Sequence, residues 1–520
     1  MNIEWAYNMM IEKMQIDLKE SGNGYKWKRF RNIYYIGVVL NEDIDEFFSS
    51  LCDKDYQTVV SMLRDKDGFY SCVIVQEEQT YIFVDHVRSF PIIIGKDSDN
   101  NQIVVTDSLE KIGGKLYLKN KEEEMKACQF INGSDTVFEN VMSVPASHCA
   151  VISDQSISIH RYYKAPFKEE KIKNIDDALD RLKVAYENVF SHISDFYHDY
   201  NYLVPLSGGH DSRLVLKLLE IFSPYSKKIV YNYGELDEMD YTYAKKAYEV
   251  ISNASDRFIH INYRDKKMAK QFRALLPEYS LFASKGVSCP CVSELCAVMD
   301  VKPKLNMKEN HVVIPGYGGV VTGLYFKKEY FEKKTYTIEE VVDVVRSTFV
   351  NQRVGHNLDH IIVKYISSLT DKQLFSLNEM LYLLQQYTFE EEQAKFIQNA
   401  TQNFNFFGLE WFTPYMTKMV LEAWGDIDPA LMLDDYIFKE LENKIYSKEE
   451  RTIPFCGSKE NTYGRKNYFG RFTKYILPRS LSKYDMFIPI IDHYKNLLLR
   501  RADGINAYVL YETIKELKKK

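Results

Sequence analysis

The sequence lacks the features that place a chain in a membrane or outside the cell. No stretch approaches the ~20 consecutive apolar residues that a helix needs to span a bilayer. Residues 1–20 mix acidic and basic side chains and contain no apolar core of a signal peptide. The 8 cysteines are scattered along the chain, which is typical of reduced thiols rather than of a disulfide framework. We therefore expect a cytoplasmic protein with no membrane partner.

The sequence also lacks an excess of basic charge. It has 67 Lys and Arg against 73 Asp and Glu, a net charge of −6. A nucleic-acid-binding surface needs a basic excess or a basic stripe, so we expect no nucleic-acid partner. The group Cys289, Cys291 and Cys296 has no paired Cys-x-x-Cys or His pair beside it, which argues against a zinc site.

Short strand-like segments dominate the first ~165 residues of the 520-residue chain, which is long enough for two or three domains. They are rich in β-branched residues and are separated by polar turns at hairpin spacing. The segments are residues 71–75, 81–84, 91–94 and 102–105, with two more within 146–159. This pattern predicts an antiparallel β-sandwich domain over residues 1–165.

After the charged link 164–173 the pattern changes to alternating strands and helices. A helix is expected to start after Asn174 or Asp176, and residues 336–520 look mostly helical. The expected strands are 202–206, 228–231, 257–261 and 311–314, and the expected helices between them are 213–222 and 237–251. Such alternation indicates a parallel sheet with helices on both faces. The predicted fold class is α/β, with an N-terminal antiparallel sandwich followed by a parallel-sheet domain over 166–520 that has a helical C-terminal part.

One loop of the second domain has the composition of a phosphate-binding site. The segment Ser207-Gly208-Gly209-His210-Asp211-Ser212 lies between an expected strand and an expected helix. The glycines allow close approach of a ligand, and the loop N–H groups with the helix N-terminus point at an anion. An aspartate beside phosphate requires a cation, and Mg²⁺ fits. The pattern favours a nucleotide triphosphate with metal over a glycine-rich turn without a ligand.

The segment 206–213 resembles the pyrophosphate loop of the asparagine synthetase family, which includes the β-lactam synthetases. Other segments resemble the family in the expected order. In the second domain these are 228–234 with Asp240 and Ala244, 312–319, 394–397 and 407–414, and in the first domain 67–69, 85–91, 106–107 and 161–163. The first-domain matches resemble the family's glutaminase half, which has an Ntn-hydrolase-like fold. The resemblance covers roughly residues 30–165 and 175–430.

The resemblance implies an ATP- and Mg²⁺-dependent synthetase that adenylates a carboxylate, releases pyrophosphate and passes the acyl group to an amine or ammonia. The substrates would be small molecules, and a homodimer is compatible with this interpretation. By the same resemblance, the nucleotide-binding residues are Leu206, Ser207, Gly208, Gly209, Asp211, Ser212, Tyr231 and Gly316.

The sequence departs from the family at the position of the glutaminase nucleophile. Family members that hydrolyse glutamine use an N-terminal cysteine, whose thiolate attacks the amide. This sequence begins Met1-Asn2-Ile3, and its first cysteine is Cys52. We therefore expect the first domain to be structural or a docking surface, without glutaminase activity.

A second departure concerns the metal. In the family an aspartate follows the second glycine loop and helps to hold Mg²⁺, but Val320 stands there in this sequence. Asp240, Asp237 and Glu238 are candidates to act with Asp211 in its place, and Asp211 with Asp240 is the predicted pair. The alternative is a nucleotide-binding member of the family that has lost catalysis.

Tyr317 occupies the position at which β-lactam synthetases carry a tyrosine that helps to deprotonate the attacking amine. A tyrosine with a pKa near ~10 acts as a base only with a carboxylate partner. Glu391, Glu392 and Glu410 are candidates, and Tyr317 with Glu410 is the predicted catalytic pair; simple packing of Tyr317 is the alternative. A lysine that stabilises the acyl-adenylate transition state is also implied, and both Lys459 and Lys466 fit.

Overall fold

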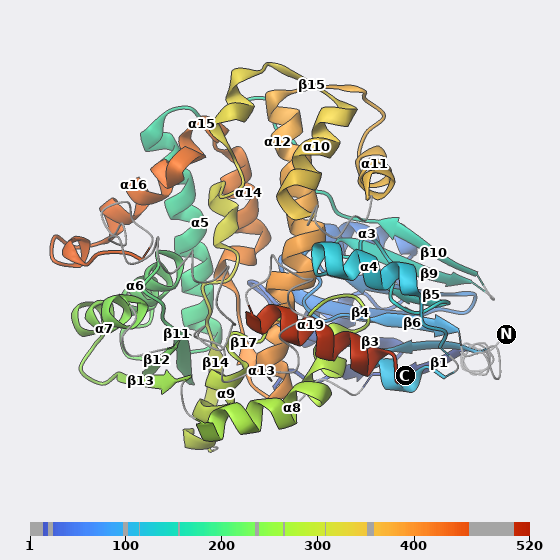
Figure 1. Cartoon of the computed structure of the whole chain (residues 1–520), viewed down its shortest axis with the longest axis horizontal. Coiled ribbons are helices and arrows are strands. Elements are labelled where there is room, and N and C mark those ends of the chain that lie inside the picture. The colour runs from blue at the N-terminus through green and yellow to red at the C-terminus, as the bar shows by residue number, and fades with distance from the viewer. Residues whose placement is uncertain are drawn as a thin grey trace, which may run out of the picture.

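Strands rich in Val, Ile and Tyr form two sheets in the first part of the chain (Figure 1). The computed structural model describes residues 14–18, 24–96, 102–113, 115–153, 156–234, 239–263, 266–306, 308–350, 358–456 and 504–520. One sheet has six strands in the order β10-β9-β5-β4-β3-β2 and the other has four in the order β1-β7-β6-β8. The strands are β1 (Met14–Asp17), β2 (Lys28–Phe30), β3 (Ile33–Val39), β4 (Gly68–Val75), β5 (Gln79–Val84), β6 (Ile93–Lys96), β7 (Ile103–Thr106), β8 (Val141–Ser143), β9 (His148–Ser153) and β10 (Ser156–Arg161).

Alternating side chains of these strands build a core between the two sheets. Val73 and Ile82 of the six-stranded sheet pack with Ile94 and Val105 of the four-stranded sheet. The outer face of the six-stranded sheet is covered by α2 (Ile44–Ser50) and α3 (Tyr56–Asp65). The outer face of the four-stranded sheet is apolar as well and joins a large core that also contains α4 (Lys119–Cys128) and the second half of the molecule.

The second half is built on a five-stranded, all-parallel sheet in the order β13-β12-β11-β14-β17. From β11 the chain proceeds to β12 and β13 on one side, and then returns to β14 and β17 on the other. Helices α6 and α7 cover one face and α8, α9 and α13 the other (Figure 1). The elements are α5 (Ile175–Phe196), β11 (Tyr200–Pro205), α6 (Asp211–Phe222), β12 (Lys228–Gly234), α7 (Met239–Ile251), β13 (Arg257–Asn262), α8 (Lys266–Ser284), α9 (Leu295–Val301), β14 (Asn310–Val313), α13 (Gln402–Phe406) and β17 (Glu410–Trp411).

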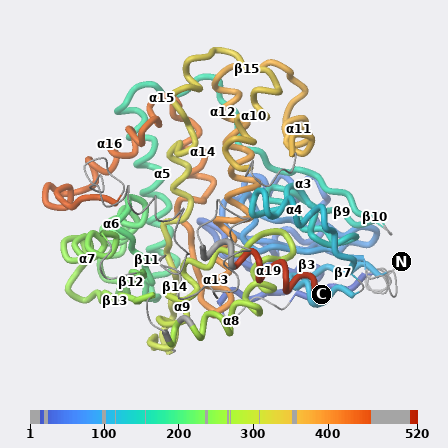
Figure 2. The backbone as a smooth tube through the Cα atoms, in the orientation of Figure 1, coloured from blue at the N-terminus to red at the C-terminus, as the bar shows by residue number. Residues whose placement is uncertain are grey.

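Helices make up most of the described C-terminal part. Two of them, α10 and α12, begin with complete capping boxes, in which a Thr or Ser and a Glu three residues later satisfy each other's backbone N–H groups. The elements are β15 (Thr335–Thr337), α10 (Ile338–Phe349), α11 (Asp359–Ser367), β16 (Leu374–Ser376), α12 (Leu377–Tyr387), the π-helical η6 (Thr388–Ile397), α14 (Lys418–Asp426), α15 (Pro429–Met432), α16 (Tyr436–Ile445) and α19 (Gly504–Leu517). In Figure 2, α19 runs beside α8 and ends near the strands of the first half, where Lys518 pairs with Glu122. Among the described helices, none has the length and apolarity that crossing a membrane requires.

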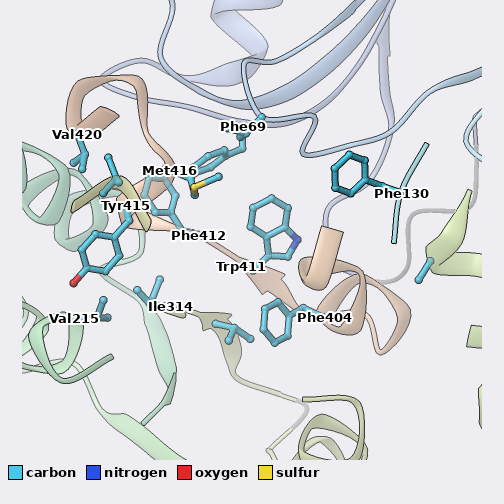
Figure 3. Close-up of a cluster of buried hydrophobic side chains, with 14 of the residues drawn as sticks. Phe69, Phe130, Val215, Ile314, Phe404, Trp411, Phe412, Tyr415, Met416 and Val420 are labelled. Atoms are coloured by element: carbon cyan, nitrogen blue, oxygen red, sulfur yellow. The ribbon is translucent and has the colours of Figure 1, made fainter. Parts of the chain in front are cut away.

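Aromatic side chains join the two halves (Figure 3). Trp411, on the edge strand β17, stacks on Phe90 with ring centroids 5.5 Å apart and meets the edge of Tyr25 at 5.8 Å. Phe69 of β4 contacts Phe412 edge-on at 5.1 Å. Because these rings are buried, the parallel sheet and the N-terminal sheets share one continuous core rather than touching through a polar interface.

Each half also caps a helix of the other. The carboxylate of Asp67, just beyond α3, accepts hydrogen bonds from the backbone N–H groups of Lys418 and Met419 at 2.9 Å each, at the start of α14. In return, the Lys418 ammonium donates to the carbonyls of Arg64 at 2.8 Å and Lys66 at 2.6 Å, at the end of α3. Both helix ends thereby gain partners for backbone groups that a helix leaves unpaired, with charges that suit the helix dipoles.

The strands and helices expected from the sequence up to residue 314 are present, and the structure differs from the expected fold in three respects. The sandwich is not wholly antiparallel, because β1 pairs parallel with β7. The expected strand at 91–94 begins later, at Ile93. The C-terminal part is not only helical: β17 adds an edge strand to the parallel sheet, and its two residues are too few to show a periodic pattern.

We predict that Asp67→Ala lowers the free energy of unfolding by about 2–4 kcal/mol, because it leaves two buried N–H groups without an acceptor and removes a charge at the start of α14. The exposed Asp65, at the end of α3, provides the matched control, and Asp65→Ala should change stability by less than about 0.5 kcal/mol. Urea unfolding of the two variants measures the difference. Equal stabilities would show that the reciprocal caps do not hold the halves together.

Candidate functional site

The candidate site lies at the carboxyl edge of the parallel sheet, between β11 and β14. These strands are neighbours, but the chain leaves them toward opposite sides of the sheet. At such a switch point the two following loops diverge and leave a crevice, where ligands of parallel α/β sheets bind. The loop after β11 is residues 206–210, which leads into α6. The loop after β14 is residues 314–318, which leads into the short 3₁₀ helix η3 (Gly319–Thr322).

The two loops approach so closely that only glycine fits at the contacts. A Cβ atom on Gly316 would lie 2.8 Å from the backbone nitrogen of Ser212, at the start of α6. A Cβ atom on Gly319 would overlap with the carboxylate of Asp211. Gly318 has a φ of +95°, a conformation that glycine adopts without strain. The second glycine loop therefore sits directly on the N-terminus of α6.

The first loop is held by its own side chains. Ser207 Oγ and Ser212 Oγ are hydrogen-bonded at 2.9 Å, and the N–H of Gly209 donates to Ser207 Oγ at 3.2 Å. The N–H of Gly208 donates to Asp240 Oδ1 at 2.8 Å. The side chain of His210, the residue before α6, accepts no hydrogen bond from the start of this 12-residue helix. The first N–H groups of α6 therefore have no side-chain cap. Exposed Ser207 and this helix N-terminus form an arrangement that suits a bound anion.

Residues 453–456 cover the back of the loop, which the sequence did not predict. Arg213 is fully buried and donates to the carbonyls of Ile453 at 3.0 Å and Pro454 at 2.9 Å. Its guanidinium lies 4.0 Å from the ring centroid of Phe455, and that ring stacks on His210 with a centroid separation of 3.6 Å. The N–H of Cys456 donates to Gly208 O at 2.9 Å. The sequence shows an arginine, Arg213, directly after the loop. It does not show the partners of this arginine, because they lie some 240 residues away in sequence.

Asp211 is the acidic residue of the first loop, and its pKa is raised. Burial raises its pKa from 3.8 to about 7; the charges of Glu442 and Asp435 add to this rise, and His210 opposes it. Asp240, the predicted second metal ligand, has another role in the structure. Its carboxylate accepts from Gly208 N and, at 2.9 Å, from Asn232 Nδ2. The acids whose charges act on Asp211 are therefore those of the α16 region and not Asp240.

The other candidates for the second metal ligand, Asp237 and Glu238, lie outside the described residues. In the described part of the chain, no three His, Cys, Asp or Glu side chains are arranged to hold a metal by themselves. A Mg²⁺ ion at Asp211 would therefore need oxygens of a bound phosphate and water, which is how Mg²⁺ is commonly held.

Tyr317 has a carboxylate partner, but it is not one of the predicted residues. The Tyr317 hydroxyl donates to Glu294 Oε2 at 2.7 Å, and Tyr233 donates to the other oxygen at 3.4 Å. Burial raises the pKa of Glu294 from 4.5 to about 7, whereas burial and the charge of Glu294 hold the pKa of Tyr317 well above 10. Glu294 is thus the member of this pair that exchanges a proton near neutral pH. Nothing in its sequence context marked it, because it precedes Tyr317 by 23 residues and meets it only through the fold.

The predicted partners of Tyr317 lie elsewhere. Glu410 accepts from the hydroxyl of Tyr200, the first residue of β11, at 3.4 Å, and therefore sits toward the end of the sheet opposite the two loops. Glu391 is paired with the buried Lys395, and Glu392 accepts from Tyr325 at 3.3 Å. The expected pairing of Tyr317 with Glu410 is replaced by the pairing with Glu294. Lys459 and Lys466 lie outside the described residues.

Tyr231 and Leu206 connect the Tyr317–Glu294 pair to the loop of residues 206–210. The N–H of Leu206 donates to Tyr231 O at 2.8 Å, which fixes the start of the loop to the middle of β12. The side chain of Tyr231 is buried, and its hydroxyl has no hydrogen-bond partner among the described residues. The charge of Glu294 acts on this hydroxyl, and burial is the larger cause that raises its pKa.

Comparisons with known proteins give no family assignment. No protein-family model matches the chain, and no curated protein matches it. Among solved structures, one titled as the allosteric regulatory enzyme of purine biosynthesis aligns at 8% identity and a TM-score of 0.16, over 45% of this chain and 62% of that chain. Glutamine phosphoribosylpyrophosphate amidotransferase from B. subtilis, complexed with ADP and GMP, aligns at 9% identity and a TM-score of 0.17, over 57% and 59%. At such TM-scores the alignments carry no argument about fold or activity.

We predict that Glu294→Gln stabilises the protein at high pH. Because burial raises the pKa of Glu294 in the folded state, this carboxylate costs no stability below about pH 4.5, and the free energy of unfolding falls as the pH rises from about 4.5 to about 7. Glutamine does not titrate. The free energy of unfolding of the variant should therefore exceed that of the wild type by up to about 3 kcal/mol at pH 8, and the two values should differ little at pH 4.5.

Denaturant unfolding at pH 4.5 and pH 8 measures this difference, with the exposed Glu332→Gln as a control that should show no pH-dependent gain. If the free energies of unfolding of the wild type and of Glu294→Gln change in parallel with pH, the result would contradict the buried state of the Glu294 carboxylate.

Proposed function

We propose that the protein is an ATP-dependent, amide-forming synthetase that adenylates a carboxylate and releases pyrophosphate. One observation carries this proposal: two glycine-tight loops meet at the switch point of the parallel sheet, over the uncapped N-terminus of α6 and beside half-buried Asp211. That arrangement supports the binding of a polyphosphate with a cation, and it agrees with the resemblance of 206–213 to the pyrophosphate loop of the asparagine synthetase family.

Each loop residue has a role in this proposal. The N–H groups at the start of α6 and the hydroxyls of Ser207 and Ser212 bind the pyrophosphate oxygens and orient it as a leaving group. Glycine at 208 and 316 keeps the backbone close enough for these contacts. Bound Mg²⁺ would neutralise the phosphate charge, with Asp211 as its protein ligand.

Tyr317 and Glu294 are proposed to handle the proton of the amine. After the carboxylate has displaced pyrophosphate from ATP, the amine attacks the acyl carbon, AMP leaves, and the amine must lose a proton. Tyr317 lies on the second glycine loop and can pass that proton to Glu294, whose raised pKa of about 7 suits an acceptor near neutral pH. The buried Glu294 carboxylate would also attract a protonated amine before the reaction.

The N-terminal half is proposed to be an Ntn-hydrolase-like domain without glutaminase chemistry. Its two packed sheets with helices on the six-stranded sheet are compatible with that fold. Its cysteines do not have the lowered pKa of a nucleophile: burial raises the pKa of Cys52, Cys72, Cys128 and Cys149. The amine or ammonia would then come from solution or from a second substrate.

A second candidate function is nucleotide binding without catalysis. Val320 favours it, because the aliphatic side chain stands where the family carries a metal-binding aspartate. This alternative predicts binding of ATP without its conversion to AMP.

The synthetase proposal predicts that the full-length protein converts ATP to AMP and pyrophosphate when a panel of carboxylates and amines is supplied with Mg²⁺. Asp211→Asn should lower pyrophosphate release at least about a hundredfold, equivalent to about 2.7 kcal/mol of transition-state stabilisation. The control Asp180→Asn changes an exposed acid of α5 and should leave the rate unchanged. Retained turnover in Asp211→Asn would refute the assignment of the loop, and ATP binding without any AMP would favour the second candidate.

We also predict that the purified chain releases no glutamate from glutamine, with or without ATP and acceptor, because the thiols of its N-terminal half are not activated. A coupled glutamate assay with a known glutaminase as positive control measures this. Glutamate release above background that is lost in Cys52→Ser would show that the first half is a working glutaminase.

A further inference from the structure

A recess with many polar side chains lies where the first half, the link 164–173 and the C-terminal helices meet. Its walls include residues of α12, η6 and α14, and it encloses about 630 Å³ of space, its mouth included. Small-molecule sites commonly have this size and often lie at junctions between structural units. Six of its polar wall residues are His86 and Tyr163 of the first half, Lys171 of the link, Gln385 and Gln386 of α12, and Glu422 of α14.

Gly425 of α14 leaves part of this recess open. A Cβ atom added to Gly425 would meet no atom within 4 Å, and its backbone is helical without a positive φ. Neither a close contact nor a left-handed conformation therefore calls for glycine at this position. Glycine weakens a helix relative to alanine. The helix thus carries a less favourable residue where a side chain would enter open space at the recess wall.

His86 brings a buried acceptor without a donor to the same recess. Only 3% of its surface is exposed, and its Nε2 lies 2.6 Å from Met416 O. A carbonyl oxygen accepts, so Nε2 carries the proton; burial lowers the pKa of His86 from 6.5 to about 3, which keeps the ring neutral. Nδ1 is then an acceptor, and it has no hydrogen-bond partner among the described residues. A donor from a bound molecule would remove the cost of this unpaired acceptor.

Two glutamine amides of α12 are also available to a ligand. Gln386 is buried, with 5% of its surface exposed. Within the described part of the chain its side-chain amide makes no hydrogen bond, and neither does that of Gln385. Each amide offers two donors and one acceptor. The recess therefore presents both donors and acceptors to a bound molecule.

The recess wall also carries one cation and one anion, each bonded to a neutral group. The Lys171 ammonium donates to Gly425 O at 2.6 Å, and Glu422 Oε1 accepts from the hydroxyl of Tyr163 at 3.0 Å. Because Glu422 precedes Gly425 by three residues on α14, the two charges lie about one helical turn apart. A molecule that carries both a positive and a negative group can form charge-assisted hydrogen bonds with both side chains.

We propose that this recess binds a small zwitterion of amino-acid size. Its ammonium group would lie toward Glu422 and His86, and its carboxylate toward Lys171 and the amide of Gln386. This inference does not rest on the proposed function, because no residue of the loops 206–210 and 314–318 lines the recess.

Isothermal titration calorimetry of the full-length protein tests the proposal with each of the common L-amino acids, and with propylamine and propionate as compounds with a single charge. At least one amino acid should bind the wild type about tenfold or more tightly than either single-charge compound. Gly425→Leu should abolish this binding, because its side chain fills the open space, and Lys171→Met should weaken it about tenfold or more. Lys168→Met is the matched control: Lys168 is an exposed lysine of the same link that does not line the recess, so binding should be unchanged.

Thermal melting without ligand checks the fold of the variants. Gly425→Leu should melt no lower than the wild type, since leucine is a better helix former than glycine and meets open space. A loss of binding in this variant then reflects the filled recess and not an unfolded protein.

Three results would overturn the inference. The first is that no amino acid binds the wild type. The second is equal binding in the wild type, Gly425→Leu and Lys171→Met, which would place the ligand elsewhere. The third is that propylamine binds as tightly as any amino acid, which would leave no part for carboxylate recognition by Lys171. The proposed function depends on the conversion of ATP to AMP, so its failure is measured separately.

Discussion

The contact between the two glycine loops is the constraint on which the rest of the site depends. Gly316 and Gly319 bring the loop after β14 onto the N-terminus of α6, where a Cβ atom would collide with Ser212 or Asp211. This approach brings Ser207 and Asp211 of the first loop and Tyr317 of the second loop to the same edge of the parallel sheet. The contact requires that β11 and β14 be neighbours, so the strand order of the parallel sheet is what creates the site.

Two acids at this edge of the sheet, half-buried Asp211 and buried Glu294, lack a full counter-charge. Burial raises the pKa of Asp211 and of Glu294 to about 7, although the two residues have different surroundings. Asp211 faces the carboxylates near α16, while Glu294 faces tyrosine hydroxyls. Acids in such surroundings cost stability in the empty protein and are therefore expected where a ligand brings positive charge. In the proposed function these ligands are a metal ion at Asp211 and an amine at Glu294.

The N-terminal half has a structural part in this arrangement. Its strands pack on Trp411 and Phe412, which lie on or beside the edge strand β17 of the parallel sheet. The reciprocal caps between α3 and α14 add charge-assisted hydrogen bonds across the same boundary. Because the two halves share one core, the first half contributes to the packing of the parallel sheet whether or not it has chemistry of its own.

Local sequence patterns were sufficient to predict many of the strands and helices and the strand–loop–helix context of residues 207–212. Strand and helix periods, and the Ser-Gly-Gly-x-Asp-Ser pattern between a strand and a helix, are local properties, and neighbours in sequence fix them. The partners of these side chains followed only from the tertiary structure: Glu294 rather than Glu410 for Tyr317, the N–H of Gly208 for Asp240, and Thr322 for Asp435. Those choices depend on contacts between residues 23 to 113 positions apart, where a carboxylate is placed by strand order and helix packing and not by its own neighbours. The short β17 and the parallel pairing of β1 escaped the sequence for the same reason, since each strand is defined by the strand it joins.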